Sequence, residues 1–121
     1  MSYTLPSARY LIPADLKRST IRRRNPVKEE QIERIKVLQH YWQHRSPDHE
    51  LLGVRDLKNL KVIEKPILDF IWTAPPEVIY CEGFGNDPDI MELFFIDHYN
   101  EDVLGSESAF YMVEWHPKHA D

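Results

Sequence analysis

Cysteine is nearly absent from this chain, which has only Cys81 among its 121 residues. One cysteine cannot form an internal disulfide, so packing has to hold the fold together. The first residues, MSYTLPSARYLIPADL, contain no basic segment followed by a continuous apolar stretch, as a secretory signal would. Residues 66–74 form the longest apolar candidate, but Asp69 interrupts them, and a membrane span needs about 20 residues. We therefore expect a cytoplasmic protein without a membrane partner.

Basic residues are scarce in the second half of the chain. Residues 75–121 contain eleven acidic residues and one base, Lys118, whereas residues 1–24 contain six bases and one acid, Asp15. The intervening residues cancel, which leaves a net charge of −5. Charge sorted in this way creates a field that steers association and disfavours like-charged surfaces. The charge pattern therefore indicates the charge of the surfaces that this protein binds, and it does not identify a chemical reaction.

Length and composition predict one folded domain. The chain is 42% hydrophobic and 12% aromatic, which is enough to build a core. Domains most often have about 100–150 residues. We divide the chain into a basic N-terminal arm or extended segment (1–24), a single α+β domain (25–117) and a loose tail (118–121).

Two helices are predicted in the first half of the domain. Asn25 is a good N-cap and Pro26 suits the first helical position. Apolar residues then recur every three or four positions through Trp42, so we expect a helix over residues 26–45. Ser46 is positioned to cap a second helix that begins at Pro47 and continues through residue 60. Residues 61–73 fit either a strand or a buried helical turn.

Three strands are predicted in the second half. Residues 78–84 are rich in β-branched and aromatic residues, residues 91–99 carry apolar side chains on both faces, and residues 108–117 form a third apolar run. Polar turns separate these segments, as in an antiparallel meander. The predicted fold class is thus α+β, with two helices followed by a three- or four-stranded antiparallel sheet.

The acidic half is the first candidate site. Seven acids gather around the two predicted turns, and they are Asp87, Asp89, Glu92, Asp97, Glu101, Asp102 and Glu107. Such a face suits a protein partner with a basic surface, because opposite fields accelerate and orient docking. An inhibitor or immunity-like protein that covers a nucleic-acid-binding surface is the sharpest form of this hypothesis. In the simpler alternative, these acids only make the turns soluble.

The basic arm is the second candidate site. Its clustered bases, suited to nucleic-acid phosphates, are Lys17, Arg18, Arg22, Arg23 and Arg24. A nucleic-acid-associated regulator is therefore the alternative function. The arm has no interleaved aromatic residues for base stacking, and a pI of about 5.6 disfavours a dedicated nucleic-acid-binding protein. A solvated arm, or one packed against the acidic half, is the simpler interpretation.

Metal binding and catalysis have weaker signals. His40 and His44 are four residues apart on a predicted helix, which is a spacing that two metal ligands can use. We expect no metal, no cofactor and no catalytic residue, although a metal-binding protein or small enzyme stays open as a third alternative. Cys81 is expected to be a small buried hydrophobe. Apolar residues on both faces of the predicted sheet also raise a homodimer as an alternative.

Overall fold

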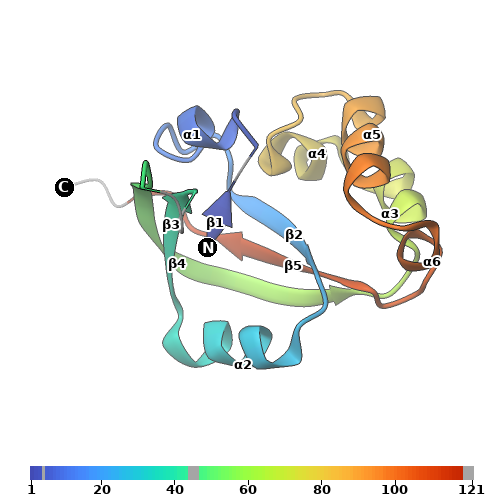
Figure 1. The fold of residues 1–121 in the computed structure, drawn as a ribbon, viewed down its shortest axis with the longest axis horizontal. Helices are drawn as coiled ribbons and strands as arrows, with labels where there is room; N and C mark the ends of the chain where they lie inside the picture. Colours follow the sequence, from blue (N-terminus) through green and yellow to red (C-terminus); the bar gives the residue numbers. More distant parts are fainter. Residues whose placement is uncertain (4, 44–46, 119–121) are drawn as a thin grey trace.

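The computed structural model describes residues 1–3, 5–43 and 47–118, and it shows a mixed α+β fold (Figure 1). Within these ranges there are five strands: β1 (Ser2–Tyr3), β2 (Ser19–Arg23), β3 (Val37–Trp42), β4 (Glu50–Ile63) and β5 (Phe110–Trp115). The helices of the same ranges are α1 (Ala8–Leu11), α2 (Pro26–Ile35), α3 (Ile67–Thr73), α4 (Pro76–Glu82), α5 (Pro88–His98) and α6 (Glu101–Leu104). The broad class is therefore as predicted.

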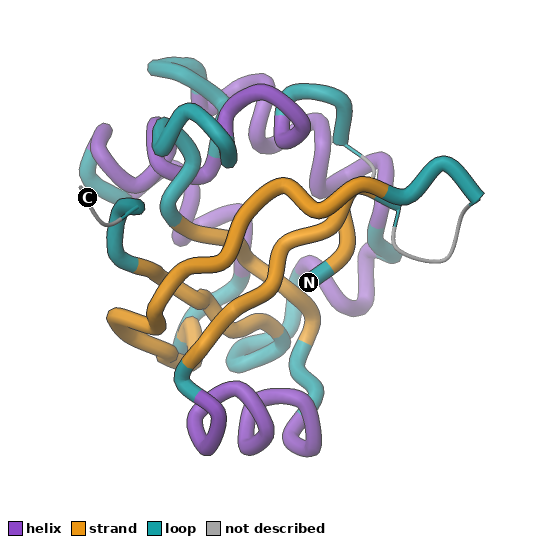
Figure 2. Tube along the Cα trace, turned by 90° about the vertical axis from the view of Figure 1, so that its left-hand side faces the viewer, coloured by secondary structure: helices purple, strands orange, loops and turns teal. Residues whose placement is uncertain are grey.

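The strands form one sheet in the order β1-β3-β4-β5-β2. β1 is parallel to β3, and the other neighbours are antiparallel. The sheet curls strongly, as the strands in Figure 2 show. The two edge strands, β1 and β2, are linked by a side chain: Arg22 of β2 donates a hydrogen bond of 2.8 Å to the Ser2 carbonyl of β1. This layout corrects the predicted meander of consecutive strands.

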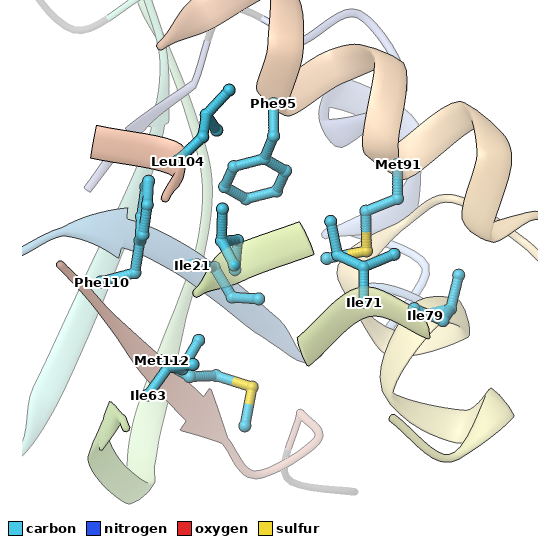
Figure 3. Packing of buried hydrophobic residues seen from close by; sticks show 10 residues of the cluster. Ile21, Ile63, Ile71, Ile79, Met91, Phe95, Leu104, Phe110 and Met112 are labelled. Carbon is cyan, nitrogen blue, oxygen red and sulfur yellow. The ribbon is translucent and has the colours of Figure 1, made fainter. Parts of the chain in front are cut away.

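Two cores lie on opposite faces of the curled sheet. The outer face of β5 and β2 packs against α3–α6, where the ring of Phe95 of α5 contacts that of Phe110 of β5 with the centroids 5.5 Å apart, and Met91 of α5 lies beside Ile71 of α3 (Figure 3). The inner face encloses a second core, which includes Tyr111, Val113 and Trp115. β5 is buried on both faces because alternate side chains of a strand point in opposite directions.

The first predicted helix is correct at its start and wrong at its end. The Asn25 side chain accepts a hydrogen bond of 3.1 Å from the Lys28 amide, and Pro26 occupies the first turn. The helix ends at Ile35, because Lys36 takes the left-handed conformation with φ of 60°. Residues 37–40 then alternate between exposed and buried positions at the start of β3 (Val37–Trp42), and the last two residues of the strand are half-buried. The predicted second helix, residues 47–60, falls mainly in β4 and is also wrong.

Two predicted strands are helices. Residues 78–84 fall mostly in α4, which ends where Gly83 adopts a φ of 97°, and residues 91–99 fall in α5. The Asp87 carboxylate caps α5 by accepting hydrogen bonds from the amides of Asp89 and Ile90. The third predicted strand is confirmed as β5. Residues 119–121 of the predicted tail lie outside the described residues.

Within the described ranges, none of the helices combines the length and the apolar character that crossing a membrane requires.

Candidate functional site

The four helices α3–α6 form an acidic unit, which we call the helical lobe. Residues 66–104 contain nine acidic residues and no lysine or arginine. The lobe gathers on one side of the sheet, at the upper right of Figure 1. Its aspartates and glutamates therefore give the lobe negative charge that no lysine or arginine within it balances.

The outward face of α5 combines this charge with exposed apolar side chains. Ile90, Leu93 and Ile96 are 53%, 59% and 46% exposed. Positions three or four apart on a helix are neighbours, so Leu93 lies between these two isoleucines and also between Asp89 and Asp97. Neither aspartate forms an ion pair within the described part of the chain. We call these five residues the α5 face.

The opposite side of α5 supplies the residues that this helix contributes to the hydrophobic core. Met91 and Phe95 are 0% and 1% exposed, and they hold the helix against the sheet. Phe94 packs on the ring of Phe84, with the ring centroids 5.4 Å apart. Since α5 already buries one apolar side, the apolar residues on its other side have no role in the cores described above.

The seven predicted acidic residues differ in their exposure and in whether they serve the fold. Asp89 and Asp97 belong to the α5 face, and Glu101 and Asp102 are exposed in the first turn of α6. Asp87 is used as the N-cap of α5, and Glu92 is half-buried. Glu107 is exposed in the turn before β5. Four of the seven residues thus lie exposed on the two helices α5 and α6.

The predicted basic arm is folded into the protein. Lys17 is 4% exposed, and its ammonium group donates to the Glu82 carbonyl. Arg22 crosses from β2 to β1 and lies over the Tyr3 ring, 5.0 Å from its centroid. Arg24 forms a 3.0 Å ion pair with Glu29. Five bases were proposed to contact nucleic acid. Two of them, Arg18 and Arg23, are exposed and form no ion pair with any residue that the structure describes.

Glu82 closes the free edge of β2. This carboxylate is 2% exposed and accepts a hydrogen bond from the Ser19 hydroxyl, while the Ile21 backbone amide also stabilises its charged form. The preceding residue, Cys81, accepts a 2.9 Å bond from the Arg18 amide through its carbonyl. Burial raises the pKa of Glu82, and the nearby Lys17 ammonium opposes that shift. The end of α4 therefore occupies the outer edge of β2, where a further strand would otherwise pair with the sheet.

A second polar cluster lies inside the curled sheet. His40 is fully buried, its Nδ1 lies 2.8 Å from the Tyr3 hydroxyl, and its ring centroid is 4.3 Å from that of Trp115. Burial lowers the pKa of His40 to about 3, and the positive amino terminus and Arg55 add to the effect. Nε2 of His40 and Nε1 of Trp115 have no hydrogen-bond partner among the described residues.

Neither cluster has the features of a working catalytic or metal site. Tyr3, Lys17, His40 and Glu82 are each under 6% exposed, so a substrate would have no direct access to them. No group of three or more potential ligands for a metal occurs in the described ranges. Nδ1 of His40 is used by the Tyr3 hydroxyl, and His44 lies outside the described residues. Burial raises the pKa of Cys81, which disfavours a reactive thiolate.

Comparisons with known proteins provide no relative. No family model matches the chain, and neither a curated protein nor a solved structure matches it.

The exposed apolar residues of the α5 face were missed in the sequence analysis. Their spacing, at positions 90, 93 and 96, is helical, and Asp87-Pro88 repeats the cap signature of Asn25-Pro26. These two signals favour a helix, but the apolar residues on both faces of residues 91–99 favour a strand, so the local sequence is ambiguous here. Glu82 and Tyr3 had no comparable signal, because their roles depend on contacts with β2 and β3 that are distant in the sequence.

Proposed function

We propose that this protein is a non-catalytic protein-binding module whose helical lobe docks a partner with a basic surface. The observation that carries the proposal is the α5 face, where three exposed apolar residues lie between unpaired aspartates. Exposed apolar residues gathered on one surface are typical of interaction sites. The surrounding negative charge selects the sign of the partner and accelerates its approach.

An inhibitor or immunity-like role is the specific form of this function. A protein that binds nucleic acid presents a basic surface, and an acidic lobe without lysine or arginine is complementary to it. The inferred role needs no cofactor and no chemistry from the lobe.

The test is capture of a partner by the full chain from its native cell extract, with and without nuclease. The key variant is Asp89→Lys/Asp97→Lys. Its matched control is Glu30→Lys/Glu33→Lys on α2, where both glutamates are exposed. The two double variants change the net charge by the same amount, so they separate the position of the charge from its total.

We expect one basic protein to be retained by the wild type and by the α2 variant, and to be lost by the α5 variant. Retention by all three chains at equal stoichiometry would contradict the proposal. Loss of all bound material after nuclease treatment would instead favour the nucleic-acid alternative through Arg18 and Arg23. Circular dichroism and thermal unfolding of each variant confirm that the fold is intact.

A further inference from the structure

The three apolar residues of the α5 face form a ridge, and the shape of this ridge indicates which kind of element would pack on it. Ile90, Leu93 and Ile96 follow one another at three-residue spacing, so they form a row about 9 Å long along α5. Rows of this kind on one helix pack into the grooves between rows on another helix. Leu93, the most exposed of the three, lies at the centre of the row.

We infer that the partner presents an amphipathic α-helix with basic flanks, which packs lengthwise along α5 with its apolar stripe on Ile90, Leu93 and Ile96. This inference rests on the proposed function and specifies the partner's contacting element. The apolar stripe covers the ridge, and the flanking lysines or arginines pair with Asp89 and Asp97. These two aspartates are about 12 Å apart along the helix axis, so matching bases are about two turns apart on the partner.

An extended segment fits this face poorly. The backbone amides and carbonyls within α5 are used inside the helix, so the face offers only side chains. A strand laid on it would leave its own backbone groups without partners, whereas a helix satisfies them internally. Strand pairing is also restricted elsewhere, because β1 has two residues and the end of α4 covers the edge of β2.

A second copy of this chain also fits poorly. A two-fold contact through antiparallel α5 helices would place Asp89 of one copy beside Asp97 of the other. Like charges at an interface repel, and the rest of the helical lobe adds further acids and no lysine or arginine. Charge complementarity therefore favours a basic helix from a different protein.

Two synthetic peptides of identical composition test the inference, each of leucine, alanine and lysine and about 27 Å long as a helix. The first places its leucines in one helical stripe with lysines on both flanks. The second distributes the same leucines around the helix. Each is titrated into the ¹⁵N-labelled full chain, and backbone amide shifts give the affinity and the location.

We expect the first peptide to bind at least about tenfold more tightly than the second and to shift amides on α5. Leu93→Ser and Asp89→Lys/Asp97→Lys should each weaken its binding, whereas Glu30→Lys/Glu33→Lys should leave it unchanged. Circular dichroism should show that the first peptide gains helix on binding.

Three outcomes would overturn the inference. Equal affinity of the two peptides would show that charge alone is recognised, which leaves the proposed function standing and removes the helix. Shifts concentrated on the strands of the sheet instead of α5 would place the site elsewhere. If neither peptide binds at millimolar concentration, while capture of a native partner still depends on Asp89 and Asp97, the partner's contact is not helical. If that capture fails as well, the proposed function also fails.

Discussion

Acidification should destabilise the protein through His40. This side chain is fully buried, and its pKa is lowered to about 3 from its ordinary value of 6.5. A proton therefore binds the unfolded chain more readily than the folded one. The contribution of neutral His40 to stability is complete above pH 6.5, and it declines as the pH falls from 6.5 toward 3.

The expected size of this loss follows from the two pKa values. Each pH unit below 6.5 removes about 1.4 kcal/mol until the folded-state pKa is approached. At pH 4.5 the loss from His40 alone is therefore roughly 3 kcal/mol. A domain of this kind has a total stability of about 5–15 kcal/mol, so the loss is easily measured.

Urea unfolding at a series of pH values between 4.5 and 7.5 measures this effect. Other groups also titrate in this range, and Glu82, whose pKa is raised, acts in the opposite direction because its stabilising contribution is lost as the pH rises. The comparison of the wild type with His40→Gln isolates the histidine. His116→Gln is the matched control, since His116 is exposed.

We expect the pH dependence to be shallower in His40→Gln and unchanged in His116→Gln. Equal slopes for the wild type and His40→Gln would refute the argument. A nuclear magnetic resonance titration that places the pKa of His40 near 6.5 in the folded protein would also refute it.

Two further predictions concern stability at neutral pH. Glu82→Ala should lower the free energy of unfolding by about 1–3 kcal/mol, because it leaves the buried Ser19 hydroxyl without its acceptor. A loss below about 0.5 kcal/mol in urea unfolding would contradict the role given to this carboxylate. Phe95→Ala should cost about 3–5 kcal/mol, whereas Leu93→Ala two residues away should change stability by under about 0.5 kcal/mol. Similar losses for these two variants of α5 would show that the assigned buried and exposed sides of the helix are wrong.

Local signals in the sequence identified some elements correctly. The cap at Asn25-Pro26 and the strand at β5 were predictable, because capping and an apolar run next to polar turns are local properties. The end of α2 was not, because Leu38 and Trp42 extend the apolar spacing of the helix by coincidence. Their place in the sheet depends on pairing with β4, which begins eight residues after Trp42.

The candidate site was predictable in its charge and not in its structure. The acidic residues of the second half were visible in the sequence, but the apolar residues on both faces of residues 91–99 favoured a strand. Burial of Met91 and Phe95 against β5 and β2 favours the helix, and the Asp87 cap supports it. Only the helix brings Leu93 between Asp89 and Asp97, since a strand would distribute these residues over two faces.

The position of β5 has a consequence for how the chain folds. Phe110 and Met112 belong to one core, while Tyr111, Val113 and Trp115 belong to the other, so this strand is a wall common to both. Its pairing with β2 joins Ile21 to Met112, which are separated by most of the chain. Contacts between residues this distant in the sequence form slowly, because closing the long loop between them loses chain entropy before the contacts stabilise the fold. We therefore expect slow folding in a single cooperative step, in which neither core is complete until β5 is inserted between them.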